Sequence, residues 1–338
     1  MELVTSLPAD TPLRQVAQHV RRIENLGFDT VHISETIRDP FAVAALAVEH
    51  SSTLTVRTSM VVAFARSPMV TALAAWDLAG FSGGRFQLGL ATQVRGNIVG
   101  RYSMPWTDPV AQLRDYVSAV REIFRVFQEG GELDHAGTHY TFDRLQPYFN
   151  PGPLDVPAPE IWTGGVNSRM CSLAGAVADG FVSHPTSSHP KVLAERIIPS
   201  LTAGGRKPRL IAVPKMITGK DPAAILAQRE AVRSELAFLY STPAYRVALE
   251  VLGLSEVGEE LTVMARAGDW ARLPDVLTDD VLDRLVTQCT YAELPEVLSL
   301  KYASLCDGIA LAVPANPADD RVFAAMCEEI RAAAASAP

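Results

Sequence analysis

A cluster of polar side chains follows a short apolar stretch in the sequence GRFQLGLATQVRGN, residues 84–97. The stretch Arg85–Ala91 is nearly continuous in apolar residues, which is typical of a strand buried on both faces in a parallel sheet. The polar residues that follow it are Thr92, Gln93, Arg95 and Asn97. Their hydroxyl, amide and guanidinium groups can hold a polar ligand through hydrogen bonds. The alternative is a solvated loop that binds nothing.

Two further strand ends carry groups suited to proton transfer. Glu35 follows the predicted strand Thr30–Ser34, and a carboxylate there is a candidate acid, base or orienting group, with Thr36 beside it. The alternative for Glu35 is a structural ion pair with Arg38 or with another base at a strand end. His184 ends a different predicted strand, where it is either a catalytic group or a core or capping histidine.

A glycine pair suggests a phosphate site. Gly164 and Gly165 end a predicted strand, Val166 follows them, and a helical run begins at Arg169. Glycines let the backbone approach a ligand closely, and the start of a helix offers free N–H groups to an anion. A plain tight turn explains the same residues equally well.

The remaining reactive side chains point to less specific chemistry. Tyr102 and Trp106 are candidates to stack on a planar ligand, and the alternative is packing within a lid. His135 and His139 are four residues apart, but HAGTH has a loop composition, so we expect no metal site. No two of the four cysteines form a CxxC pair, which predicts reduced, buried thiols in a cytoplasmic protein.

The elements that must position these residues form a repeating pattern. Eight stretches rich in Val, Ile and Leu alternate with helical patterns, and glycines mark several of the returns from helix to strand. Eight such units predict an α/β fold, a (β/α)8 TIM barrel, rather than an open doubly wound sheet, whose GxGxxG signature is absent. The predicted strands are Leu3–Leu7, Thr30–Ser34, Thr55–Ala65, Arg85–Ala91, Pro159–Gly164, Gly180–His184, Arg209–Thr218 and Asp307–Val313.

Three connections are too long for ordinary barrel loops. We interpret residues 92–108, 129–157 and 219–306 as insertions in a single domain that spans residues 1–338. The last of them contains several helical patterns and is predicted to be a helical insertion between strands seven and eight. In a barrel, the residues that follow the strands face one shared mouth, so the polar groups described above are expected to meet there.

Composition excludes several classes of partner. The chain has a formal net charge of −8 and scattered basic residues, so we expect no nucleic-acid surface. No apolar run approaches the roughly 20 residues of a membrane helix. The start, MELVTSLPAD, has neither a basic nor an apolar region of a signal peptide, which favours a cytoplasmic location.

Several of these stretches resemble one known family. They are AFARSP, FSGGRFQLGLATQVRGN, GTHYTFDRLQPYFNPGP, PEIWTGGVNSRM, ADGFVSHP, STPAYRVALEVLGL and TDDVLDRL. Together they span nearly the whole chain and resemble the bacterial-luciferase-like family of flavin and deazaflavin oxidoreductases. Within it, the chain is most similar to actinobacterial members that use the deazaflavin coenzyme F420.

The resemblance implies where a cofactor binds. It places the cofactor ring near a bulged third strand with a non-prolyl cis peptide between Ser59 and Met60, and the cofactor phosphate at the glycine turn. The segment from Thr92 onward would lie along the ring and the ribityl chain. The cofactor-binding residues implied are Ser59, Met60, Thr92, Gln93, Arg95, Asn97, Gly164, Gly165 and Val166.

Two residues depart from the family pattern. Thr36 stands where several deazaflavin-dependent members carry a histidine, and Ala91 stands where the fourth strand often has a glycine. The resemblance therefore assigns no proton-handling histidine. We take Glu35, Thr36 and His184 as the candidate catalytic residues, and Tyr102 and Trp106 as the candidate substrate contacts.

The resemblance implies an oxidoreductase that exchanges a hydride between coenzyme F420 and a small organic substrate, as a homodimer. One alternative is an FMN-dependent monooxygenase that works with a separate reductase. The other is a cofactor-binding barrel without turnover, which the changes at Thr36 and Ala91 suggest. No charge pattern in the three insertions identifies the substrate.

Overall fold

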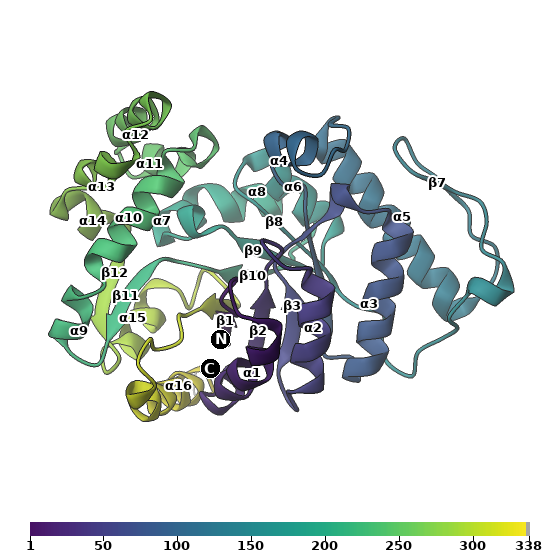
Figure 1. Cartoon of the computed structure of the whole chain (residues 1–338), viewed down its shortest axis with the longest axis horizontal. Coiled ribbons are helices and arrows are strands. Elements are labelled where there is room, and N and C mark those ends of the chain that lie inside the picture. The colour runs from purple at the N-terminus through teal and green to yellow at the C-terminus, as the bar shows by residue number, and fades with distance from the viewer. Residues whose placement is uncertain (336–338) are drawn as a thin grey trace.

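Eight parallel strands close into a barrel in the computed structural model, which describes residues 1–335 (Figure 1). The strand order is β3-β2-β1-β13-β10-β9-β8-β5-β4, and β3 also pairs with β5, which closes the ring. The short strands β3 and β4 are two parts of one barrel strand, because both pair with β5. The predicted (β/α)8 barrel is therefore confirmed. The barrel strands are β1 (Glu2–Ser6), β2 (Thr30–Ile33), β3 (Thr55–Thr58), β4 (Val61–Val62), β5 (Phe86–Ala91), β8 (Ile161–Gly165), β9 (Gly180–Ser183), β10 (Arg209–Ala212) and β13 (Gly308–Ala310).

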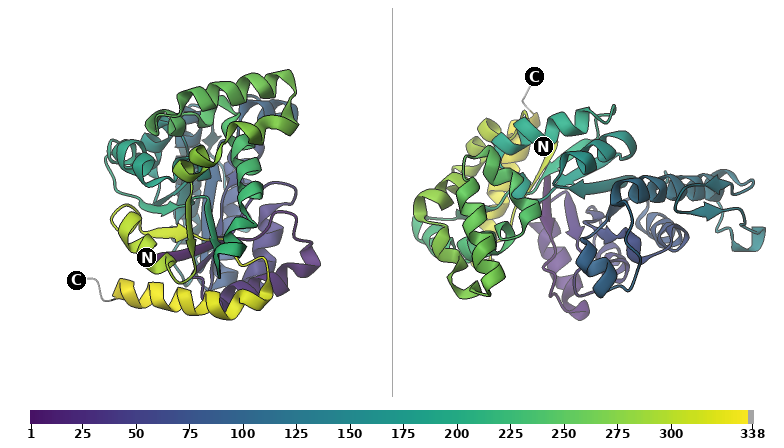
Figure 2. Two further views of the ribbon diagram at one scale, coloured as in Figure 1. Left: turned by 90° about the vertical axis from the view of Figure 1, so that its left-hand side faces the viewer. Right: turned by 90° about the horizontal axis from the view of Figure 1, so that it is seen from above.

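Helices surround the barrel and pack against their neighbours around the ring (Figure 2). In the first of them, Val16, Val20 and Ile23 share one buried face, as their spacing requires. The chain then turns into β2 through Gly27, whose φ of 86° lies in the left-handed region. The helices are α1 (Val16–Asn25), α2 (Pro40–Glu49), α3 (Pro68–Ser82), α5 (Pro109–Glu129), α6 (Ser168–Val177), α7 (Pro190–Val192), α8 (Ile198–Thr202), α15 (Leu294–Lys301) and α16 (Asp320–Ala335).

Three predicted strands are markedly shorter than expected, and the last along the chain, Asp307–Val313, keeps only Gly308–Ala310. The stretch Thr55–Ala65 forms β3 and β4 and then a 3-10 turn at Ala63–Ala65. The stretch Arg209–Thr218 was predicted as one strand, but only Arg209–Ala212 belongs to the barrel. The chain then leaves the barrel and forms β11 (Met216–Gly219), which pairs in parallel with β12 (Thr287–Thr290). Both halves of this stretch have the same apolar character, so the break is invisible to periodicity.

The segments outside the barrel have structure of their own. Between β11 and β12 the chain is helical, and this region forms one side of the molecule, at the left of Figure 1. A hairpin of β6 (His135–Ala136) and β7 (Thr141–Phe142) lies at the other side, and with α5 it extends away from the barrel (Figure 2). A short helix, α4 (Arg95–Gly100), follows β5. The helices between β11 and β12 are α9 (Pro222–Leu226), α10 (Arg229–Tyr240), α11 (Val247–Val251), α12 (Ser255–Ala267), α13 (Leu273–Val276) and α14 (Asp279–Leu285).

A buried ionic network fills the amino-terminal half of the barrel interior. The Arg57 guanidinium donates to Gln87 Oε1 at 2.6 Å and to Glu2 Oε1 at 2.9 Å, and its Nη1 lies 3.0 Å from His32 Nε2. It also stacks on the Trp162 ring at 3.6 Å from the centroid. Burial lowers the pKa of Arg57 to about 10, while Glu2 opposes this shift. Burial and Arg57 together hold the pKa of His32 well below its usual value. This network therefore closes the barrel interior on the side opposite the mouth.

Candidate functional site at the barrel mouth

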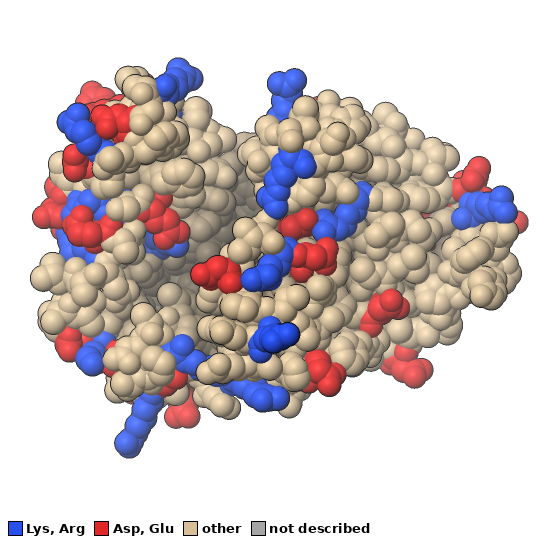
Figure 3. Space-filling model, in the orientation of Figure 1, with Lys and Arg blue, Asp and Glu red and all other residues tan. Residues whose placement is uncertain are grey.

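The candidate site lies where the barrel strands end. The first residues after β2, β5, β8 and β9 are brought to one end of the barrel because all the strands are parallel. A cleft of about 590 Å³ opens beside this mouth, between the ends of β1, β10 and β13 and helix α10. Figure 3 shows the molecule hollowed between the helical insertion, at the left, and the barrel. The lining of this cleft includes none of the cofactor-binding residues named from the sequence.

The broken third strand enters the mouth at a cis peptide bond between Ser59 and Met60, as the resemblance implied. Gly89 of β5 permits this arrangement, because a Cβ there would lie 1.9 Å from the carbonyl oxygen of Thr58 and 2.7 Å from Met60 Sδ. Gly164 faces the same side chain, and a Cβ there would lie 3.3 Å from Met60 Cε. Two glycines on neighbouring strands thus make room for Met60 at the mouth.

The glycine turn after β8 leads directly into α6. Asn167 caps this helix, since its Oδ1 accepts from the backbone N–H of Met170 at 2.9 Å. The N–H groups of Ser168 and Arg169, in the first turn of α6, have no intrahelical acceptor and are available to an anion. Gly165 has a structural role as well, because a Cβ there would lie 2.6 Å from Met170 Cγ. Val166 is half-buried in the same turn.

Glu35 is held in an ion pair. Arg66 Nη1 donates to both of its oxygens, at 2.8 and 2.7 Å, and the backbone N–H of Val62 donates to Oε2 at 2.7 Å. Arg66 also pairs with Asp39 at 3.0 Å. The structural alternative considered for Glu35 is therefore the one observed, with Arg66 as the partner, because Arg38 turns away and donates to the backbone of Thr11.

The segment after β5 forms a lid fastened to the end of β2. The Tyr102 hydroxyl donates to Glu35 Oε1 at 3.4 Å, and Arg101 donates to the carbonyl oxygen of Thr36. The Thr36 side chain is exposed, so the structure does not group it with the mouth residues. Trp106 packs edge-on against Phe64, with 6.1 Å between the ring centroids. Tyr102 and Trp106 thus hold the lid to the barrel.

The four polar residues after β5 divide into two groups. Thr92 and Gln93 use their side chains locally, the first donating to the Gln93 carbonyl at 3.0 Å and the second accepting from Val94 N–H at 2.9 Å. Arg95 is exposed on α4, and within residues 1–335 its guanidinium takes part in no ion pair or hydrogen bond. Asn97 is half-buried in the same helix. Arg95 and Asn97 are the ones free to meet a ligand.

His184 lies between the barrel and the insertion. Its ring stacks on Tyr245, which follows α10, with centroids 4.3 Å apart. Its Nδ1 accepts from the backbone N–H of Thr186 at 3.3 Å and lies 2.8 Å from the Thr186 hydroxyl. Burial, reinforced by the charge of Lys215, lowers the pKa of His184 to about 4. The imidazole is therefore neutral at pH 7 and carries its proton on Nε2.

The residues weighed as metal or redox groups have other partners. His135 Nε2 lies 2.7 Å from Asp115 Oδ1, a contact that fastens the hairpin to α5. Among the described residues, no three His, Cys, Asp or Glu side chains gather as metal ligands. The four cysteines are buried free thiols, and burial raises the pKa of each. Over the same residues, no helix is long and apolar enough to cross a membrane.

A family model described as luciferase-like monooxygenase matches residues 1–307. This chain belongs to the luciferase-like family. An uncharacterised protein of Mycobacterium tuberculosis is 37% identical over 289 residues, which cover 83% of this chain and 84% of that protein. An F420-dependent glucose-6-phosphate dehydrogenase of Intrasporangium calvum is 30% identical over 238 residues, which cover 63% and 68% of the two chains.

The fold of this luciferase-like protein also matches a solved structure. The coenzyme F420-dependent tetrahydromethanopterin reductase from Methanopyrus kandleri superimposes with a TM-score of 0.77 over 98% of this chain and 99% of that chain. The sequence identity is 18%, so the likeness concerns the fold. The family resemblance inferred from the motifs is confirmed.

Three residues of the site were missed at the sequence level. Gly89 interrupts an apolar strand, which is a recognised signal of close backbone approach. Arg66 lies in the quoted motif AFARSP, but nothing local pairs it with Glu35. Tyr245 lies in the helical insertion, and no spacing rule connects it with His184.

The low pKa of His184 makes the stability of this luciferase-like protein depend on pH. An unfolded histidine titrates near 6.5. Between pH 4 and 6.5 the unfolded chain therefore binds a proton that the folded chain rejects, so the free energy of unfolding rises with pH across this window and is independent of His184 above it. Between pH 4 and 6.5, we expect the free energy of unfolding to rise by about 2–3 kcal/mol less in His184→Gln than in the unaltered protein. Denaturant unfolding of both proteins between pH 4 and 8 measures it, and parallel profiles would contradict it.

Glu35 is expected to act as a positioning residue. Glu35→Gln keeps an acceptor for Val62 but loses the charge that faces Arg66, so the free energy of unfolding should fall by about 1–2 kcal/mol. Tyr102→Phe, which removes only the long hydrogen bond to Glu35, should cost less. Denaturant titration of the ligand-free proteins measures both. If Glu35 were the proton donor, Glu35→Gln would instead lower turnover by about a hundredfold or more and leave stability unchanged.

Proposed function

We propose that this protein is an oxidoreductase that transfers a hydride between coenzyme F420 and a small organic substrate. The observation that carries the proposal is the mouth itself, where Met60 packs against Gly89 and Gly164 and a glycine turn leads from β8 into α6. The relatives named above as F420-dependent support the choice of cofactor. When bound, the deazaflavin would supply two-electron hydride chemistry.

The residues present fit such a cofactor. The first-turn N–H groups of α6, at Ser168 and Arg169, are suited to its phosphate. The Met60 side chain packs over Gly89 and Gly164, and we expect its flexible thioether to contact the planar ring. Arg95, exposed and without a partner among residues 1–335, is available to an anionic tail. The lid that carries Arg95 is held over the mouth by Tyr102 and Glu35.

His184 is the side chain best placed to meet the substrate. Its neutral ring accepts at Nδ1 and therefore presents an Nε2–H donor. We expect this group to hydrogen-bond an oxygen or nitrogen of the substrate and so to polarise the bond that receives the hydride. A ring whose pKa is about 4 acts at pH 7 by hydrogen bonding rather than as an imidazolium acid.

A binding experiment tests the cofactor. The purified protein is titrated with oxidised F420 and with FMN, and binding is followed by the fluorescence of each cofactor. We expect a micromolar dissociation constant for F420 and one at least about tenfold higher for FMN. Micromolar binding of FMN without binding of F420 would overturn the proposal.

A turnover experiment separates the remaining alternatives. Reduced F420 is mixed with the protein and a panel of small ketones, imines and alkenes, and its reoxidation is followed without oxygen. The family description favours an FMN-dependent monooxygenase as the second candidate, which oxygen uptake with reduced FMN and a substrate would reveal. Tight F420 binding with no turnover of any compound would instead favour a cofactor-binding barrel.

A further inference from the structure

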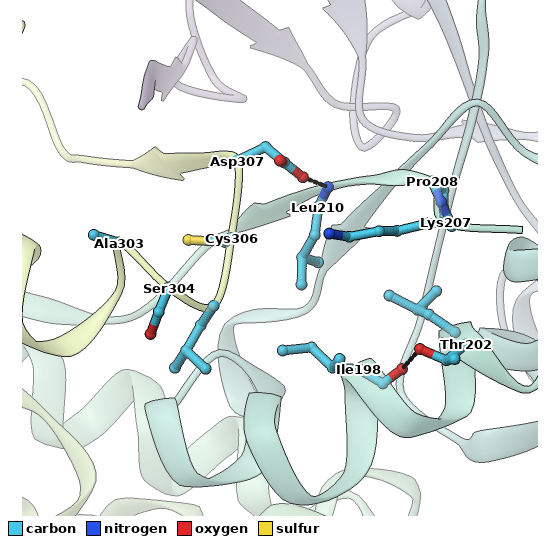
Figure 4. Close-up of a pocket in the computed structure, with 11 residues that line it drawn as sticks. Ile198, Thr202, Lys207, Pro208, Leu210, Ala303, Ser304, Cys306 and Asp307 are labelled. Carbon is cyan, nitrogen blue, oxygen red and sulfur yellow. Dashed lines mark hydrogen bonds between the residues drawn. The ribbon is translucent and has the colours of Figure 1, made fainter. Parts of the chain in front are cut away.

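A second cavity lies at the opposite end of the barrel from the mouth. It has a volume of about 250 Å³ and is enclosed by three segments, namely α8, the chain at 207–210 that starts β10, and the chain at 303–307 that starts β13 (Figure 4). In TIM barrels this end is remote from the chemistry. The cavity is therefore separate from the proposed cofactor site.

The wall of this cavity is apolar on the side of the core and polar elsewhere, where Thr202, Lys207, Ser304 and Asp307 contribute to it. Ile198 and Leu201 come from α8, Leu210 from β10 and Leu305 from the segment before β13. Leu201 and Leu210 are only 5% and 4% exposed, so the cavity reaches into the core. An apolar cavity of about 150 Å³ takes up a benzene-sized molecule, so this one has room for roughly ten non-hydrogen atoms.

One charge faces the cavity without a partner. Lys207 is an exposed residue at the opening of the cavity, its side chain extends across the cavity in Figure 4, and within residues 1–335 its ammonium takes part in no ion pair or hydrogen bond. The two neighbouring cations are paired, Arg206 with Asp179 at 3.9 Å and Arg209 with Glu160. Lys207 is thus the cation of this turn that is left available to a ligand.

The other charge at the cavity is already engaged. Asp307 Oδ2 accepts from the backbone N–H of Leu210 at 2.7 Å, and the Asp307 backbone bonds to Leu210 and to Glu2. It ties β13 to β10 and β1, as Figure 4 shows for Leu210. Because this carboxylate stays at the rim, it opposes any anion at Lys207, and it opposes a dianion such as phosphate more strongly than a single carboxylate.

We propose that this cavity is a binding site for a small monocarboxylate with an apolar body of about six to ten carbon atoms. The carboxylate pairs with Lys207, and the apolar body lies against Leu201, Leu210 and Leu305. A ligand there contacts α8 and the starts of β10 and β13, so it stabilises the folded state by an amount that grows with the logarithm of its concentration above the dissociation constant. The proposal is independent of the cofactor and of the reaction at the mouth.

Sodium hexanoate is the probe, and 1-hexanol is its uncharged counterpart. Isothermal titration calorimetry should give a dissociation constant on the order of 1 mM for hexanoate, and thermal unfolding should shift upward as hexanoate is added. Hexanol should bind at least about tenfold more weakly, because it lacks the charge that faces Lys207.

Three variants locate the binding. Lys207→Met should weaken hexanoate binding at least about tenfold and bring it to the level of hexanol. Leu305→Trp should fill the cavity and abolish binding of both compounds, while thermal unfolding without ligand shows that it is folded. Lys191→Met, on α7 outside the cavity, is the matched control and should bind as the unaltered protein does.

Two results would overturn the proposal. One is the absence of saturable binding at about ten times the expected dissociation constant. The other is hexanoate binding that is unchanged in both Lys207→Met and Leu305→Trp, which would place the ligand elsewhere on the protein.

Discussion

Gly89→Ala is expected to weaken cofactor binding at least about thirtyfold, which corresponds to ~2 kcal/mol of binding free energy. The added Cβ would lie 1.9 Å from the carbonyl oxygen of Thr58, which is backbone and cannot rotate away. The chain at Ser59–Met60 must therefore move, and with it the surface proposed to support the cofactor ring. Overpacking of this kind also lowers the free energy of unfolding, by about 1–3 kcal/mol. Fluorescence titration with F420 and denaturant unfolding measure the two effects.

Gly96→Ala is the matched control for this prediction. Gly96 lies on α4, seven residues after Gly89, and a Cβ there would have no atom within 4 Å. Its effect on stability should stay within about 0.5 kcal/mol. Equal cofactor affinities for Gly89→Ala and the unaltered protein would show that the ring lies elsewhere. A loss of stability without a loss of affinity would lead to the same conclusion.

Arg57→Met is expected to lower the free energy of unfolding by about 3–5 kcal/mol. The Arg57 side chain is 1% exposed, and its removal leaves the Glu2 carboxylate and the Gln87 amide oxygen without their shared donor inside the barrel. It also removes the group that stacks on Trp162 at 3.6 Å. Urea denaturation followed by circular dichroism measures the change.

Two further variants test the reason for this loss. Arg57→Lys keeps the charge, but its single ammonium nitrogen cannot occupy the three positions from which Nε, Nη1 and Nη2 reach Gln87, His32 and Glu2, so its cost should lie between those of the unaltered protein and Arg57→Met. Arg121→Met removes an ion pair with Asp179 whose arginine is 41% exposed, and it should cost less than about 1 kcal/mol. If Arg57→Met cost no more than Arg121→Met, the buried network would contribute nothing beyond a surface pair.

Much of the fold was predictable because its strands and helix ends have recognisable local sequence patterns. A parallel barrel strand buried on both faces is a short apolar run, and the end of a helix is marked by a glycine in the left-handed region, as at Gly27. The errors fell where two structures share one pattern. Thr55–Ala65 and Arg209–Thr218 are apolar at most of their positions, and the points at which each leaves the barrel depend on neighbours that are distant in the sequence.

The sequence by itself determined the barrel, the strand ends that meet at its mouth, the glycine turn before α6 and the membership of the luciferase-like family. The roles of the mouth residues were decided by the tertiary structure. Glu35 meets Arg66 31 residues later, and His184 meets Tyr245 only because the insertion folds back onto β9. The physical reason is that hydrophobic periodicity reflects which face of an element is buried, whereas an ion pair or a ring stack depends on which elements become neighbours. That choice is made when the barrel closes, and it places the candidate acid Glu35 in an ion pair with Arg66.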